Sequence, residues 1–440
     1  MKLPATLAFN TGYRVLNMVV LLMIVVLVSK LAGVSGYGLL SLMVVNAAIF
    51  NLLSAFGMDA GIIYHSAGDK LAPAKIVTLI FCTIAAQLLL LGLAEWIHYT
   101  VTGYYWLFKN NQASYWWVGL LFLLSVSLTE KYTALFSGHH LFVLCSKILL
   151  YTNLLVLAVF AVLFFYFPGY DANRLIALYV LLYLLQPVAL VLLFHRRVKN
   201  ASRFSLISLP EIKVFLSFSM VTLVTNSIQF LAYRMDYWFI EYFRGEKELG
   251  WYSLSVKLAQ VFWVLPVLFA AILFPLVAKE GDKYNDEHML SFSRLLFLFN
   301  LLAGILAFIL APWGIPLVFG DMYRESVLLF RILLPGILLF CPTTILAAWF
   351  AGKGRLRVNF RGSCICFACV ALLDILLVPR QGMKGASIAS SIGYTLASVY
   401  TVAVYCRQTN TPVHKLFFFR QADWHYFRKT FYTTLIKRAR

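Results

Sequence analysis

Three ionisable residues, Arg234, Asp236 and Lys257, lie within strongly apolar stretches of the sequence. A charge in an apolar environment is costly, so such residues usually line a water-filled cavity or bind a charged group. An arginine and a lysine together can hold a phosphate or another anion. Asp374, in the apolar stretch 372–379, is a further isolated acid that suits either a cation partner or a coupling ion.

Polar side chains recur between residues 222 and 236 at spacings of four and three, which is the period of one helical face. They are Thr222, Asn226, Gln229, Tyr233 and Asp236. Hydrocarbon cannot satisfy these groups, so this face is predicted to contact protein or water. Ser253, Lys257 and Gln260 share one face of the following apolar stretch in the same way.

Three charges near the ends of apolar stretches leave two interpretations open. Arg14 suits either contact with an anionic ligand or an orientation signal. Arg331 and Asp59 suit an interface better than a cavity wall. The predicted substrate-binding residues are therefore Lys257, Asp236, Arg234, Asp374, Arg331, Arg14, Gln260, Asn226 and Gln229.

The cysteines and histidines do not indicate a metal site. Cys364 and Cys366 would point in nearly opposite directions on a helix, and His139 and His140 have no Cys or carboxylate beside them. The sequence also lacks a Gly-x-Ser-x-Gly motif, a phosphate-binding glycine loop and a zinc-type histidine pair. We expect no catalytic residues, no metal and no cofactor, and leave proton or sodium coupling open.

The composition predicts a polytopic membrane protein. Of the 440 residues, 62% are hydrophobic and 12% are charged, against roughly 25% charged residues in soluble chains. Apolar runs of about 20 residues recur along nearly the whole length, as membrane-spanning helices require. The net charge of +19 lies in alternate loops and in the C-terminal tail, so a nucleic-acid-binding surface is not expected.

The expected fold is all-α, with twelve membrane-spanning helices in two six-helix bundles. The predicted spans are 10–33, 39–63, 76–101, 115–137, 147–167, 174–194, 214–240, 250–278, 292–311, 327–350, 362–379 and 385–406. The predicted domains are an N-terminal bundle, a basic cytoplasmic linker, a C-terminal bundle and a basic aromatic tail, covering 1–195, 196–213, 214–406 and 407–440.

The distribution of basic residues predicts the orientation. The expected cytoplasmic loops and termini, with Lys131 counted among them, hold 25 of the 37 Lys and Arg residues, and the expected external loops hold 8. Both termini are therefore predicted to be cytoplasmic. The tail, which mixes aromatic and basic residues, suits either a helix on an anionic membrane surface or a frayed basic end.

A weak internal repeat relates the two halves. A shift of 214 residues places Ala134–Gly138 on Ala348–Gly352 and Gly36-Tyr37 on Gly250-Trp251. Two halves of like orientation imply a pseudo-two-fold axis along the membrane normal, with a central cavity between them.

Three groups of motifs follow one another along the chain. The first contains Ser29-Lys-Leu-Ala-Gly33, Gly36-Tyr-Gly38 and Phe56-Gly-Met-Asp-Ala60. The second contains Tyr233-Arg-Met-Asp236, Leu249-Gly-Trp-Tyr252, Pro266 and Pro275, and the third Leu377-Val-Pro379, Gly382 and Gly385-Ala-Ser-Ile-Ala389. Together they resemble the polysaccharide (O-antigen, Wzx-type) flippases of the multidrug/oligosaccharidyl-lipid/polysaccharide exporter superfamily. Asp374 departs from the family pattern, in which asparagine is expected.

The resemblance implies a flippase of the bacterial plasma membrane. Its substrate would be a polyprenyl-diphosphate-linked oligosaccharide, moved to the external leaflet for O-antigen, capsule or exopolysaccharide biosynthesis by alternating access of two bundles. Membrane lipids and other polysaccharide-assembly membrane proteins would be its partners.

Two alternatives to this function remain. One is a cation-coupled multidrug exporter of the same superfamily, in which Asp236 and Asp374 would form an ion site. The other is a membrane-embedded enzyme of glycan assembly. Arg234, Lys257 and Arg331 favour an anionic ligand over a cationic one.

Overall fold

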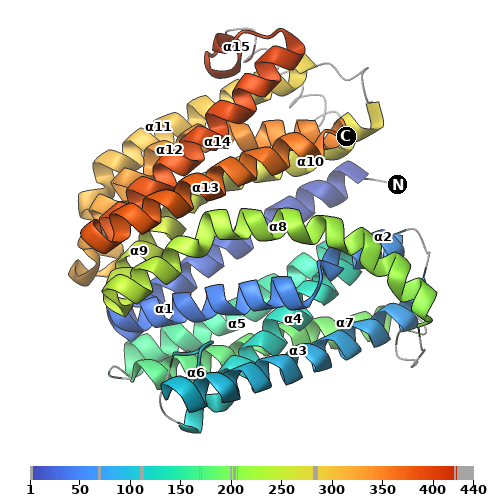
Figure 1. Ribbon diagram of the computed structural model, residues 1–440, viewed down its shortest axis with the longest axis vertical. Coiled ribbons are helices and arrows are strands. Elements are labelled where there is room, and N and C mark those ends of the chain that lie inside the picture. The colour runs from blue at the N-terminus through green and yellow to red at the C-terminus, as the bar shows by residue number, and fades with distance from the viewer. Residues whose placement is uncertain are drawn as a thin grey trace. The chain divides into compact units, whose positions relative to one another are not determined.

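The computed structural model describes residues 3–67, 71–109, 113–167, 169, 171–198, 201, 205, 207–280, 286–420 and 423. These residues form helices and no strand. Among the described residues, ten helical segments are long and apolar enough to cross a membrane, and two of them, Ala172–Arg197 and Glu246–Lys279, combine consecutive helices. This confirms the predicted all-α membrane class, whereas the count of twelve stays a prediction. The chain divides into two compact units, Met1–Phe230 (unit 1) and Leu231–Arg440 (unit 2) (Figure 1).

Unit 1 is built on the first helix, which packs against α5, α4 and α6 (Figure 1). Its elements are α1 (Leu3–Ser54), α2 (Met58–Ala67), α3 (Pro73–Thr102), η1 (Ala113–Tyr115), α4 (Trp116–Gly138), α5 (Phe142–Tyr166), α6 (Ala172–Tyr183), α7 (Leu185–Arg197) and the first part of α8 (Leu209–Arg244). One apolar core includes Met43, Phe122 and Phe160, and a second joins α2, α4, α7 and α8.

The structure divides the region of the predicted spans 10–33 and 39–63 at a different place from the predicted loop. Instead of a loop between residues 33 and 39, α1 continues through a kink at Gly33, whose φ is 68°. Glycine adopts this left-handed conformation without a Cβ penalty, so the bend needs no loop. The second span is interrupted instead after Ser54, where Phe56 and Gly57 both have positive φ before α2 begins.

Unit 2 contains the last part of α8 and the remaining helices. They are α9 (Glu246–Ala259), η2 (Gln260–Trp263), α10 (Val264–Glu280), α11 (Asp286–Phe319), η4 (Asp321–Tyr323), α12 (Glu325–Gly352), α13 (Leu356–Gln381), α14 (Met383–Thr409) and α15 (His414–Phe417). Helix α12 packs against α14, α10, α11 and α9, and α13 runs beside α14 (Figure 1).

The predicted eighth span, 250–278, is a broken helix. The 3₁₀ turn η2 separates α9 from α10. Pro266 has no N–H to donate to the carbonyl of Phe262, four residues earlier, so that carbonyl is left without its helical partner. The thiol of Cys341 on α12 lies 3.7 Å from this oxygen and donates to it.

The contact between α12 and α14 depends on Gly336. A Cβ at this position would lie 2.5 Å from the carbonyl oxygen of Ser391. We therefore expect Gly336→Ala to destabilise the protein by about 1–3 kcal/mol, since a backbone atom cannot move aside cheaply. Thermal unfolding of the purified protein measures this loss. Gly314→Ala in α11, where nothing lies within 4 Å of the added Cβ, is the matched control, and equal destabilisation by both changes would contradict the prediction.

The C-terminal tail folds back onto unit 2. Leu416 of α15 is fully buried, and Arg294 of α11 forms an ion pair with Asp423 at 2.5 Å. Residues 414–420 and 423 therefore correspond neither to a helix on the membrane surface nor to a frayed end. The rest of the predicted tail, residues 424–440, lies outside the described residues.

Candidate functional site

Asp236 of α8 is the centre of a buried polar group in unit 2. Its side chain is 1% exposed. One carboxylate oxygen accepts hydrogen bonds from the hydroxyl of Tyr252 on α9 and, at 3.0 Å, from Ser390 Oγ on α14. The other accepts from the backbone N–H of Tyr237 at 2.9 Å. Three helices thus converge on one carboxylate.

Asp374 of α13 adds a second carboxyl to this group. It is fully buried, and neither of its oxygens has a hydrogen-bond partner among the described residues. It interacts electrostatically with Asp236. Two buried carboxyls that interact electrostatically are not both stable as bare anions, so one of them must take up a proton or be compensated by a cation. The pair is therefore suited to bind one positive charge.

Arg234 and Lys257 form a pair of cations in the same unit. The guanidinium of Arg234 donates to the hydroxyl of Tyr237 and to Oε1 of Gln260, each at 3.1 Å. Lys257 of α9 is exposed, interacts electrostatically with Arg234, and makes no hydrogen bond or ion pair with the described part of the chain. Two like charges that interact electrostatically repel each other, so together they favour an anion.

Aromatic rings hold the 3₁₀ turn next to this cation pair. The rings of Tyr233, Trp263, Phe340 and Tyr394 contact one another with centroids 5.3 to 6.1 Å apart. Trp263 belongs to η2, and the other three rings come from α8, α12 and α14. Offset and edge-to-face contacts of this kind add stability beyond their buried area. The 3₁₀ turn η2 is therefore held at its first residue by the hydrogen bond between Gln260 and Arg234, and at its last residue by the ring contacts of Trp263.

The remaining predicted residues are Arg331, Asn226, Gln229 and Arg14. Arg331 donates from Nε to the carbonyl of Phe308 at 2.9 Å and lies over the Phe308 ring. Asn226 and Gln229 are exposed on the part of α8 that belongs to unit 1. The side chain of Thr222 lies outside the described residues.

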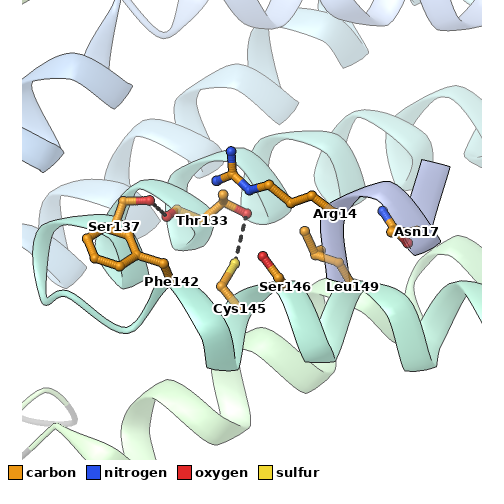
Figure 2. Close-up of a pocket in the computed structure, with 8 residues that line it drawn as sticks. All are labelled: Arg14, Asn17, Thr133, Ser137, Phe142, Cys145, Ser146 and Leu149. Carbon is orange, nitrogen blue, oxygen red and sulfur yellow. Dashed lines mark hydrogen bonds between the residues drawn. The ribbon is translucent and has the colours of Figure 1, made fainter. Parts of the chain in front are cut away.

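Arg14 lines a pocket of about 110 Å³ in unit 1. Figure 2 shows its side chain extending from α1 toward Thr133 of α4. The wall is completed by Asn17, Ser137, Phe142, Cys145, Ser146 and Leu149. Hydroxyl, amide and guanidinium groups line this pocket and none of the described lining residues has a carboxylate, so it suits a small anion or water.

Sequence reasoning missed a second buried polar group, which surrounds Lys131 in α4. The charge count placed this lysine in a loop, but its side chain is fully buried within unit 1. The adjacent pair Glu130-Lys131 inside a 23-residue helix was the available signal. Among the described residues, no group of three or more His, Cys, Asp or Glu could hold a metal ion.

Comparisons with known proteins relate this chain to polysaccharide assembly. A family model described as "Polysaccharide biosynthesis protein" matches residues 27–328. The capsular polysaccharide biosynthesis protein CapF of Staphylococcus aureus is 26% identical over 172 residues, which cover 37% of this chain and 43% of CapF. The chain thus matches less than half of the length of this relative.

Solved structures with a similar fold are membrane transporters. The lipid II flippase MurJ, in an inward closed conformation, has a TM-score of 0.71 at 11% identity, covering 94% of this chain and 89% of MurJ. An inward-facing multidrug resistance MATE family transporter of the MOP superfamily has a TM-score of 0.66 at 11% identity, covering 90% of this chain and 96% of the transporter. At such identities the likeness shows a shared fold.

Proposed function

Because the chain belongs to the polysaccharide biosynthesis protein family, we propose that it is a flippase for a polyprenyl-diphosphate-linked oligosaccharide. It moves this substrate from the cytoplasmic to the external leaflet of the bacterial plasma membrane, for the assembly of a surface polysaccharide. The fold supports the proposal, because a lipid II flippase shares it. Both termini are cytoplasmic, and membrane lipids and other polysaccharide-assembly proteins are its partners.

The observation that carries this proposal is the cation pair Arg234 and Lys257. Lys257 has no ionic partner among the described residues, and its neighbouring charge is a second cation. A diphosphate supplies several acceptor oxygens and the missing negative charge. A bound diphosphate reduces the repulsion between Arg234 and Lys257, so the pair selects an anionic head group.

The carboxyl pair Asp236 and Asp374 is the proposed coupling site. It binds a proton or a monovalent cation, and its occupancy differs between the inward and outward states of an alternating-access cycle. Asp236 is held by α9 and α14 through Tyr252 and Ser390. A charge bound here is thereby linked to the mutual packing of three helices.

Two substitutions distinguish the roles of the two acids. We expect Asp236→Asn to lower the initial transport rate about 5- to 150-fold, the range of ordinary coupling free energies. Asp374→Asn leaves Asp236 as the one acid of the pair. The hydrogen bonds that Asp236 accepts stabilise its ionised form, so transport should persist with little pH dependence. Flipping in proteoliposomes at several pH values measures both effects. A pH profile of Asp374→Asn identical to that of the wild type would contradict the prediction.

A multidrug exporter is the second candidate, and the buried carboxyl pair and the MATE-like fold favour it. Expression in one strain that lacks its polysaccharide flippase and in another that lacks its drug exporters tests both functions. We expect surface polysaccharide to return in the first strain and drug sensitivity to stay unchanged in the second. Drug resistance without restored polysaccharide, at equal protein levels, would reverse the assignment. A glycan-assembly enzyme is supported less well, since the similar structures are transporters.

A further inference from the structure

The pocket that Arg14 lines is built from three helices of unit 1. Its described lining residues come from α1, α4 and α5 (Figure 2). Its volume of about 110 Å³ is several times the space of about 10–15 Å³ that one water molecule requires. The pocket can therefore hold a group of several heavy atoms, and the chemistry of its walls decides which kind.

The helices around the pocket are basic. Helices α1 and α5 contain no Asp or Glu, and Glu130 is the single acid of α4. Glu130 accepts from Asn51 Nδ2 of α1 at 2.5 Å and does not belong to the described lining of the pocket. The basic residues of the three helices are Arg14, Lys30, Lys131 and Lys147. Four basic residues against one acid attract an anion to this part of the unit.

Arg14 has no hydrogen-bond or ionic partner in the described part of the chain. Its side chain extends from α1 toward Thr133 of α4 (Figure 2). A guanidinium group presents five N–H donors in a planar fork that matches the oxygens of a phosphate. Helix α5 begins at Phe142 in the pocket wall, and its N-cap residue Leu141 has an apolar side chain. The positive end of the α5 dipole thus adds to the charge of Arg14.

Two further donors line the pocket beside Arg14. Thr133 Oγ1 accepts from the thiol of Cys145 at 3.8 Å (Figure 2), so its own O–H is left to donate. Asn17 Oδ1 accepts from Asn153 Nδ2 at 2.8 Å, which leaves the N–H₂ group of Asn17. The donors come from two helices and outnumber the two oxygens of a carboxylate. A phosphoryl group, with four oxygens around one phosphorus atom, matches them better.

Two polar contacts between α1 and α5 fix the walls of the pocket. Ser146 Oγ donates to Asn10 Oδ1 at 2.7 Å, in addition to the contact of Asn153 with Asn17. Each contact joins residues 136 positions apart, so the two helices keep one register over two turns, or about 10 Å. Arg14 lies between the two contacts on α1. A site with fixed walls loses little conformational freedom when it binds a ligand.

We propose that this pocket is a binding site for a phosphoryl group, with Arg14 as its main contact and Thr133 and Asn17 as further donors. It is a second anion site, and it shares no residue with the cation pair Arg234 and Lys257. It lies next to the connection between α4 and α5, which the distribution of basic residues predicts to be cytoplasmic. The phosphate of an anionic lipid in the cytoplasmic leaflet or of a soluble ester can therefore reach it.

Phosphate binding to the purified full-length protein tests this proposal. All variants also carry Lys257→Ala, so that binding at the cation pair of unit 2 does not contribute. Sodium phosphate, exchanged for sodium chloride at constant ionic strength, is expected to raise the melting temperature of this background. Adding Arg14→Gln should weaken phosphate binding about 10- to 100-fold, as the loss of a charged hydrogen bond predicts. Adding Thr133→Val should weaken it about 2- to 10-fold, because one neutral donor is lost.

Nanodiscs that contain equal parts of phosphatidylglycerol and phosphatidylcholine distinguish the two sources of the phosphate. Native mass spectrometry of the protein released from them counts the lipids that stay bound. Retention of phosphatidylglycerol that Arg14→Gln abolishes identifies a lipid head group as the ligand. Phosphate binding without such retention identifies a soluble phosphate ester.

Lys30→Gln is the matched control, since it removes a cation of the same helix that lies over the ring of Phe164, and it should bind phosphate as the background does. Equal binding by Arg14→Gln and the background would overturn the proposal. So would an equal loss in Lys30→Gln, or the absence of both phosphate binding and lipid retention. Should Arg14→Gln fail to fold, Thr133→Val decides: weakened binding supports the site, and unchanged binding contradicts it. These readouts are independent of transport, so they stand even if the flippase assignment fails.

Discussion

Replacing Lys257 by alanine is expected to stop the export of surface polysaccharide while the protein level stays normal. Lys257 is exposed as a residue, has no ionic partner among the described residues and has a second cation, Arg234, as its electrostatic neighbour. A hydrogen bond to a charged ligand contributes about 1.5–3 kcal/mol, so its loss weakens substrate binding about 10- to 150-fold. Quantification of cell-surface polysaccharide, with immunoblotting of the protein, measures the result.

The chain offers matched controls for this substitution. Lys247→Ala removes an exposed lysine from the same helix, α9, where it lies over the ring of Trp251, and should leave export unchanged. Lys257→Arg keeps the charge and should retain a substantial part of the activity, whereas Lys257→Glu should retain none. Binding of inorganic diphosphate to the purified protein gives a second readout. Wild-type export by Lys257→Ala, or an equal loss in Lys247→Ala, would contradict the role of this residue.

Hydropathy and motif order predicted the class and the family of this chain correctly. Membrane spans depend on local composition, which a sequence displays directly. The resemblance to polysaccharide flippases rested on motifs spread over the whole chain, and the match of residues 27–328 to the polysaccharide biosynthesis protein family confirms it.

The partners of these residues could not be predicted from the sequence. Ser390 lies 154 residues after Asp236, and helical periodicity gives a face but not the helix that covers it. Lys131 was misplaced for a related reason, because its polar partners Asn51 and Gln87 are 80 and 44 residues away. Without them a lysine near the end of an apolar run resembles an orientation signal. Long-range packing supplies the information that local patterns lack.

Breaking the ion pair between Arg294 and Asp423 is expected to have the largest effect on stability. The two side chains are 1% exposed, and Arg294 also donates to the carbonyl of Lys415 at 2.7 Å. Removal of Asp423 leaves the buried guanidinium with the half-exposed Glu287, at 3.3 Å, as an ionic partner, and the loss of a buried partner costs about 3–5 kcal/mol. Asp423→Ala should therefore lower the melting temperature and expose the tail to protease. The exposed pair Arg324–Asp321, with the same chemistry at 2.9 Å, is the control, since such pairs contribute about 0–1 kcal/mol.

The pH dependence of the ion pair between Arg294 and Asp423 has a definite sign. Burial raises the pKa of Asp423, but hydrogen bonds from Arg294 and from the backbone N–H of Arg420 outweigh burial, and the pKa lies below its ordinary value of 3.8. A carboxyl whose pKa is lowered by folding stabilises the folded state above its ordinary pKa and loses this effect as the pH falls through the lowered value. Proteolysis of the tail should thus be constant from neutral pH down to about pH 4 and increase below it. An increase between pH 7 and pH 5 would show that another group controls the tail.

Replacing both Arg294 and Asp423 by apolar residues should recover part of the stability lost in Asp423→Ala, because no charge then stays buried and unpaired.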